Sequence, residues 1–140
     1  MIVNDIPEIS IVAVLGRGLP NEESIALRVR EGVNLGQYGI MLGIYQHSKL
    51  ARPLQNSLFW FGDGMVEKGD WIFVNTGEGQ PRCSQTTDGL NHIFSVFWNK
   101  TATVFANSNL VPILFRIDGV EVLEPPEDVP QISTIANSLR

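Results

Sequence analysis

Two stretches of this chain carry apolar side chains at every second position, and this period of two constrains the fold most strongly. They cover residues 24–30 and 38–44. Successive side chains of a β-strand point to opposite faces, so the pattern predicts strands with one buried face. Arg28 and Arg30 fall on the other face of the first stretch, where we expect them to be solvated. The residues predicted to share one core are Ile25, Leu27, Val29, Ile40 and Leu42.

Nowhere do apolar residues keep a period of 3.6 over a dozen positions, so no long amphipathic helix is predicted. Turns rich in glycine and aspartate separate further short apolar segments. These further predicted strands are residues 9–15, 58–61, 71–75, 92–98, 103–105 and 111–117. Residues 120–123 are expected to form a closing hairpin or bent strand with the last one, around Asp118-Gly119. Residues 76–89 read as one long polar loop. Such closely spaced strands predict an all-β sandwich or barrel.

The chain has 140 residues, which suits one domain that can bury a core without a disulfide or metal. We place this domain at residues 1–124. The sequence from Pro125 to Pro130 reads as a stiff acidic linker, so residues 125–140 are expected to form a C-terminal tail. Within it, residues 131–140 are expected to be a single helical turn or a loose tail.

The net charge is −5, with ten basic residues scattered among fifteen acidic ones. Because nucleic acids and anionic membranes reward clustered Lys and Arg, neither is expected as a partner. Cys83 is the one cysteine and cannot form an internal disulfide. Acidic residues near the start, with an apolar run of only strand length, predict neither a signal peptide nor a membrane span. A cytoplasmic location is therefore expected.

No motif carries a recognisable cofactor or metal site, and none is predicted. Residues 76–81 are rich in glycine and follow a strand, but a phosphate loop needs a helix start after it, and none is expected. The loop is predicted instead to join two strands of a hairpin. His47, Cys83 and His92 are the available soft metal ligands, and their wide spacing forms no short-range pair.

No catalytic set is predicted either. Serine has no nucleophile-elbow motif around it. Asp63, Glu67 and Asp70 are the acids from which a catalytic pair would be drawn. They lie in a turn-rich stretch, where we expect solvated carboxylates with ordinary pKa values.

Aromatic residues concentrate in the predicted strands and are expected to be mostly core. Neighbours such as Phe97 and Trp98 cannot both face one core, so part of this surface needs a cover. A symmetric dimer or ring would supply it, with Trp60, Phe97 and Trp98 as candidate interface anchors. The other option is that the tail from Pro125 folds back over its own sheet.

The segment from Leu58 to about Leu123 resembles lamin-tail domains. The stretches that carry the resemblance are Phe59-Trp60-Phe61, residues 66–74, Thr76-Gly77-Glu78-Gly79, Phe97-Trp98 and Val104-Phe105-Ala106-Asn107, with residues 25–33 and 38–42 upstream. The chain departs from the pattern at Phe105 and at Asn107-Ser108-Asn109-Leu110. The resemblance implies an immunoglobulin-like β-sandwich of about seven to nine strands, used as a non-enzymatic module for protein contacts. It transfers no functional residue.

The expected function is therefore a non-catalytic binding or assembly module that acts on a protein partner or on itself. Two alternatives stay open. One is a small hydrolase with Asp63, Glu67 or His92 in a cleft, which a pocket joining two of them would favour. The other is a structural subunit of a virion or surface layer, which a closed ring or large symmetric oligomer would favour.

Overall fold

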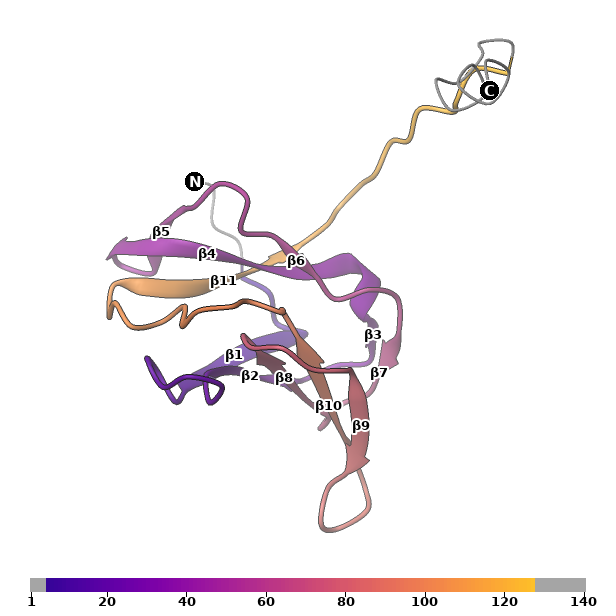
Figure 1. Cartoon of the computed structure of the whole chain (residues 1–140). Helices are drawn as coiled ribbons and strands as arrows, with labels where there is room; N and C mark the ends of the chain where they lie inside the picture. Colours follow the sequence, from indigo (N-terminus) through magenta and orange to yellow (C-terminus); the bar gives the residue numbers. More distant parts are fainter. Residues whose placement is uncertain (1–4, 128–140) are drawn as a thin grey trace, which may run out of the picture.

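The computed structural model describes residues 5–127, which form two packed β-sheets and a small accessory ribbon (Figure 1). Its helical content in this range is one short 3-10 turn, η1 (Leu35–Gln37), and no described helix is long and apolar enough to cross a membrane. The strands are β1 (Ile9–Leu15), β2 (Ser24–Val29), β3 (Val33–Asn34), β4 (Tyr38–His47), β5 (Leu50–Pro53), β6 (Phe59–Trp60), β7 (Met65–Val66), β8 (Trp71–Asn75), β9 (Arg82–Gln85), β10 (His92–Phe97) and β11 (Leu110–Arg116).

The larger sheet has the strand order β1-β2-β8-β10-β9. All its neighbours are antiparallel except β8 and β10, which are parallel. The smaller sheet has the order β11-β4-β5, and β6 also pairs with β4. Between β5 and β6 the chain leaves β4, and the buried Ser57 hydroxyl accepts a hydrogen bond from the Leu42 N–H there. The ribbon pairs β3 with β7.

The core lies between the two sheets, as the alternation predicts. Ile25, Leu27 and Val29 from β2 are at most 1% exposed, and they belong to one cluster with Ile40 and Leu42 from β4. The all-β prediction is confirmed, and so is the shared core. Of the two arginines expected to be solvated, Arg30 is exposed, but Arg28 is half-buried and stacks on Trp71.

Two predictions about the segment that connects strands of the larger sheet are wrong. Residues 76–89 are not a single loop, because β9 lies within them and pairs with β10. Residues 76–81 are not a hairpin loop either, because β8 and β9 are separated by β10. The loop crosses the end of β10, and Gly79 passes directly over the Phe97 ring, where a Cβ would lie 2.5 Å from ring carbons.

The closing hairpin at residues 120–123 is also absent, and the register of β11 on β4 explains why. Ile117 donates its N–H to the Gln37 carbonyl at 2.6 Å, as the last rung of that ladder. A two-residue turn at Asp118-Gly119 would need the same N–H to point the opposite way. Residues 118–127 instead run away from the sheets as an extended segment (Figure 1). The turn or tail expected at 131–140 lies outside the described residues.

Residues 103–105 form a loop instead of the predicted strand, and a buried carboxylate binds the backbone of this loop. Glu23, 2% exposed, accepts hydrogen bonds from the N–H groups of Val104 and Phe105 at 2.6 and 2.7 Å. It also accepts from the Gly18 N–H at 2.9 Å and from the Thr76 hydroxyl at 3.1 Å. The residue therefore ties the loop before β11 to both β2 and β8, and it holds Phe105 in the core.

Asp70 corrects the expectation of a solvated carboxylate with an ordinary pKa. It is 2% exposed and accepts hydrogen bonds from the Glu67 N–H at 2.8 Å and the His92 N–H at 2.9 Å, with a third from the Asn91 amide. Burial alone would raise the pKa of Asp70, but these hydrogen bonds outweigh it and lower the pKa. The carboxylate thus joins the turn before β8 to the start of β10.

We predict that Glu23→Gln lowers the free energy of unfolding by roughly 3 kcal/mol at neutral pH. A neutral amide cannot accept all four hydrogen bonds, and its NH₂ group would face backbone N–H donors. Urea unfolding measures the change, and Glu22→Gln at the adjacent exposed position is the matched control. Equal stability of the two variants would contradict the structural role of Glu23.

The same pair of proteins gives a pH signature. Burial raises the pKa of Glu23, but the hydrogen bonds from Val104, Gly18, Phe105 and Thr76 prevail and lower it from its ordinary 4.5. A lowered folded-state pKa stabilises fully above the ordinary value and is lost as pH falls through the folded value. The stability difference between wild type and Glu23→Gln should therefore shrink below about pH 4.5, and a constant difference would contradict this.

Candidate functional site

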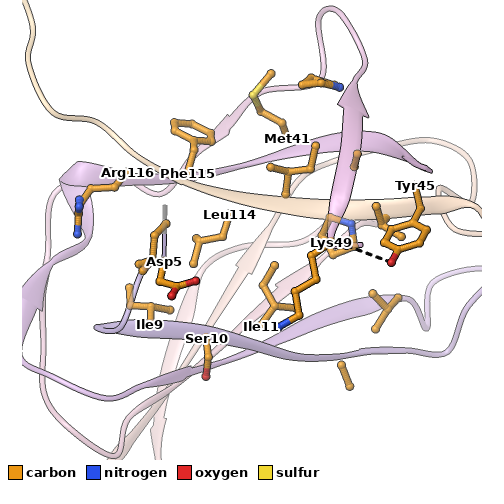
Figure 2. Close-up of a pocket in the computed structure, with 18 of the residues that line it drawn as sticks. Asp5, Ile9, Ser10, Ile11, Met41, Tyr45, Lys49, Leu114, Phe115 and Arg116 are labelled. Atoms are coloured by element: carbon orange, nitrogen blue, oxygen red, sulfur yellow. Dashed lines mark hydrogen bonds between the residues drawn. The ribbon is translucent and has the colours of Figure 1, made fainter. Parts of the chain in front are cut away.

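The open side of the sandwich contains an apolar groove of about 920 Å³ between β1 and β11 (Figure 2). β1 is an edge strand of the larger sheet, and β11 is an edge strand of the smaller one. In Figure 2 the side chains of Ile9, Ile11 and Leu114 point into the space between these strands. One edge of each sheet therefore lines the same cavity.

The groove continues around β11 to the outer side of the smaller sheet. Ile113 and Phe115 lie on that side, because they pair with Met41 and Gly39 in the ladder, whereas Leu114 pairs with the buried Ile40. The lining is apolar on both sides; its members include Ile6, Val14, Met41, Ala51, Pro53, Val111 and Pro112. A ligand that fills it presents apolar groups in two opposite directions.

An arginine fixes each end of the groove. At one end Arg116, the last residue of β11, contacts Glu8 just before β1 at 2.6 Å. At the other end Arg17, just after β1, donates to the Leu110 carbonyl at 3.0 Å. The two edge strands therefore run in opposite directions and are held together at both ends. Tyr38 also donates to Glu8 at 3.2 Å, and burial, followed by the Glu8 charge, raises the pKa of Tyr38.

The backbone of β11 offers free hydrogen-bonding groups to the groove. Tyr45 donates its N–H to the Asn109 carbonyl, and Ile117 donates to Gln37, so the odd-numbered residues of β11 face β4. The even-numbered ones face the groove. Among the described residues, nothing bonds the N–H groups of Leu114 and Arg116 or the carbonyls of Pro112, Leu114 and Arg116. Pro112 has no N–H to donate, and proline within a sheet is found mainly in edge strands.

Two glycines on β4 make room for the outer side of the groove. A Cβ at Gly39 would lie 2.4 Å from the Phe115 ring and 2.7 Å from the Phe59 carbonyl. A Cβ at Gly43 would lie 2.5 Å from the end of Ile113. Both side chains of β11 therefore lie flat across β4, which gives the groove its apolar outer wall.

Few charges enter the groove. Lys49 follows β4 and its side chain points into the cavity, with its backbone N–H held by the Tyr45 hydroxyl at 3.2 Å (Figure 2). Asp5 and Asp118 lie at the lining together with Arg116. The groove therefore combines a free strand edge and apolar walls with a few charges of both signs, which suits an extended, mainly apolar peptide.

The residues predicted as interface anchors do not come together at this groove. Trp60 is 51% exposed, and its indole N–H donates to the Gly36 carbonyl. Trp98 turns inward against the core, 5.5 Å from the Phe59 ring. Phe97 lies on the other face of its strand, beneath Arg82 and Gly79. The three side chains belong to separate surfaces of the molecule.

A second partly apolar surface is the outer face of the larger sheet. Trp71 and Phe73 of β8 stack there with ring centroids 5.9 Å apart, and the Arg28 guanidinium lies 4.6 Å from the Trp71 ring. β8 is thus apolar on both faces, since Ile72 and Val74 are fully buried. Arg28 covers part of this face.

The residues of the hydrolase alternative lie elsewhere. Asp63, Glu67 and His92 are all exposed, and none of them lines the groove. A smaller cavity of about 260 Å³ contains Glu23, whose carboxylate is already held by its four structural hydrogen bonds. Within residues 5–127 no three His, Cys, Asp or Glu side chains gather as metal ligands, and Cys83 is exposed.

Sequence reasoning missed the groove because its walls come from both ends of the described chain. The strands themselves were predicted correctly, but their status as edges depends on pairing between distant segments. One local signal was available. Pro112 within an apolar strand marks an edge, since proline cannot donate to a neighbouring strand.

Comparison of the sequence with protein-family models and with curated proteins finds no match.

We predict that Gly39→Ala lowers the free energy of unfolding by about 2 kcal/mol, because the added methyl group displaces the Phe115 ring from β4. Urea unfolding is the measurement. Gly64→Ala is the matched control, since a Cβ there meets nothing within 4 Å. A near-neutral Gly39→Ala would show that Phe115 does not lie across β4 and that the outer wall of the groove is different.

Proposed function

We propose that this protein is a non-catalytic binding or assembly module, and that its groove receives an extended apolar segment of a protein partner. The segment adds to the smaller sheet as a new strand beside β11. The observation that supports this most directly is the row of free backbone groups at Leu114 and Arg116, facing an apolar cavity. Strand addition is a common way to recognise peptides, with main-chain hydrogen bonds supplying affinity.

The walls define what the segment looks like. Its alternate side chains would point toward Ile9 and Leu114 on one side and toward Phe115 and Met41 on the other. Both directions are apolar, so the best segments carry apolar residues at successive positions rather than on one face only.

The alternatives receive less support. The hydrolase hypothesis requires two of Asp63, Glu67 and His92 in one cleft, and none of these residues lines the groove. A structural subunit of a virion or surface layer would use the same strand edge, and a closed ring in solution would distinguish it. We propose protein partners rather than nucleic acid, because acids outnumber bases in the chain.

We also propose that the likeness to lamin-tail domains reflects a related sandwich. In its favour, the matching stretches form β6, β8 and β10 around one core. The parallel pairing of β8 with β10 departs from the two antiparallel sheets of an immunoglobulin-like domain. Residues 103–105, where the sequence already departs from the family pattern, form a loop.

A peptide selection on the full-length chain tests the proposed function. We expect the selected peptides to be extended and apolar at successive positions, and Met41→Glu to weaken their binding at least about tenfold by placing a charge in the groove. Met65→Glu is the matched control, because Met65 is 69% exposed and outside the groove.

N-methylation of the selected peptide supplies a sharper control. Methyl groups on one alternate set of backbone nitrogens should abolish binding, and those on the other set should be tolerated, because only one set faces β11. Peptides that bind Met41→Glu normally, or that tolerate both methylation patterns, would contradict strand addition at this edge.

A further inference from the structure

The segment that leaves β11 is extended, carries exposed apolar side chains and has no partner among residues 5–127. Val120, Val122 and Leu123 are 77%, 78% and 92% exposed. We call residues 118–127 the arm. It makes no hydrogen bond with the rest of the described chain, and it begins beside the groove, since Arg116 and Asp118 line that cavity. Within residues 5–127 there is thus both an unpaired strand edge and an unpaired extended segment.

We propose that the arm of one copy occupies the groove of a second copy, so that two chains exchange arms in a symmetric dimer. This inference rests on the proposed function and names the partner. Exchange of an identical element is a low-cost route to a closed dimer, because each copy supplies what the other lacks.

One antiparallel register of the arm on the free edge matches both charge and apolar side chains. Leu114 and Arg116 face the groove and need hydrogen-bonded partners two residues apart in the arm. Pairing Arg116 with Glu121 brings opposite charges together, and the same antiparallel register pairs Leu114 with Leu123. Leu123 then points between the sheets, toward Ile9 and Ile11.

The two remaining neighbours fit the same register. Val122 lies opposite Phe115 on the outer wall, so an apolar pair forms there as well. The next hydrogen-bonding position would pair Pro112 with Pro125, and neither has an N–H to donate. The ladder therefore ends at Leu114 on β11 and at Leu123 on the arm, which matches the length of free edge that the groove offers.

The path of the chain favours a second copy over closure onto the same copy. Closure needs a reversal within residues 117–120, where Gly119 is the residue best able to take a positive φ, and its φ is not in that region. Ile117 is held on Gln37, and the chain after it leaves the body as the arm without turning back (Figure 1). Residues 117–120 belong to no strand, so they can act as the hinge of an exchanged arm.

Light scattering on the full-length chain across a dilution series gives the first test. We expect a concentration-dependent species of twice the 15.5 kDa chain mass. Leu123→Asp should raise the dimer dissociation constant at least about a hundredfold, because a symmetric dimer loses the buried leucine twice. Leu90→Asp is the matched control, at an exposed leucine in the turn between β9 and β10, and should leave the dimer unchanged.

Disulfide trapping identifies the occupant of the groove. Phe115→Cys and Val122→Cys are introduced together with Cys83→Ser, because non-hydrogen-bonded pairs in antiparallel strands lie close enough for a bridge. Exchange predicts a covalent dimer under oxidation. A cross-linked monomer would mean that the arm closes on its own β11, which overturns the exchange but leaves strand addition at the groove intact.

Two other results would also overturn the exchange. They are a wild-type chain that is monomeric and does not cross-link, and a dimer that Leu123→Asp leaves unchanged. In either case the proposed function is judged separately, by whether selected peptides bind with the alternate N-methylation pattern. Failure of the peptides together with a trapped dimer would mean that the edge accepts only the arm.

Discussion

The register of β11 on β4 determines most of what this structure can do. The rung at Ile117 and Gln37, together with that at Asn109 and Tyr45, fixes which backbone groups of β11 point to β4. The alternate groups then face the groove, and they have no partner within the described part of the chain. The same rung prevents a tight turn at Asp118-Gly119, so the chain leaves the sandwich as an extended arm. One choice of register therefore produces both a free edge and a free strand.

Two buried carboxylates hold the loops that frame this arrangement. Glu23 fixes the loop before β11 through backbone N–H groups, and Asp70 fixes the start of β10 in the same way. Both carboxylates accept hydrogen bonds mainly from the backbone rather than from cations, which offsets the cost of burial. Arg17 and Arg116 then tie the ends of β1 and β11 across the open side. The groove is thus a fixed feature of the sandwich.

The sequence predicted the strands well where the signal was local. Period-two placement located the core residues of β2 and β4 because alternation depends on neighbours alone. Residues 103–105 read as a strand but form a loop, since their N–H groups bind Glu23, which lies 81 and 82 positions away. β9 was missed because its four residues are all exposed and show no alternation.

The candidate site was less predictable for the same reason. Trp60, Phe97 and Trp98 are conspicuous in sequence, yet the structure distributes them over separate surfaces. The groove instead depends on Ile9 and Leu114, which are ordinary strand residues until pairing makes their strands edges. Whether a strand lies at a sheet edge depends on pairing between distant segments, which a local sequence pattern does not contain. Pro112 was the one local signal of an edge strand.

Amide hydrogen exchange along β11 tests the central claim most directly. With the groove empty, in dilute wild type or in Leu123→Asp, the N–H groups of Ile113 and Phe115 should exchange slowly, and those of Leu114 and Arg116 should exchange fast. Among these four amides, raising the concentration of the wild-type chain should slow only Leu114 and Arg116, and the arm amides of Glu121 and Leu123 should slow with them. Equal protection of all four amides in the dilute chain, or no response of Leu114 and Arg116 to concentration, would contradict a free strand edge filled by a second copy.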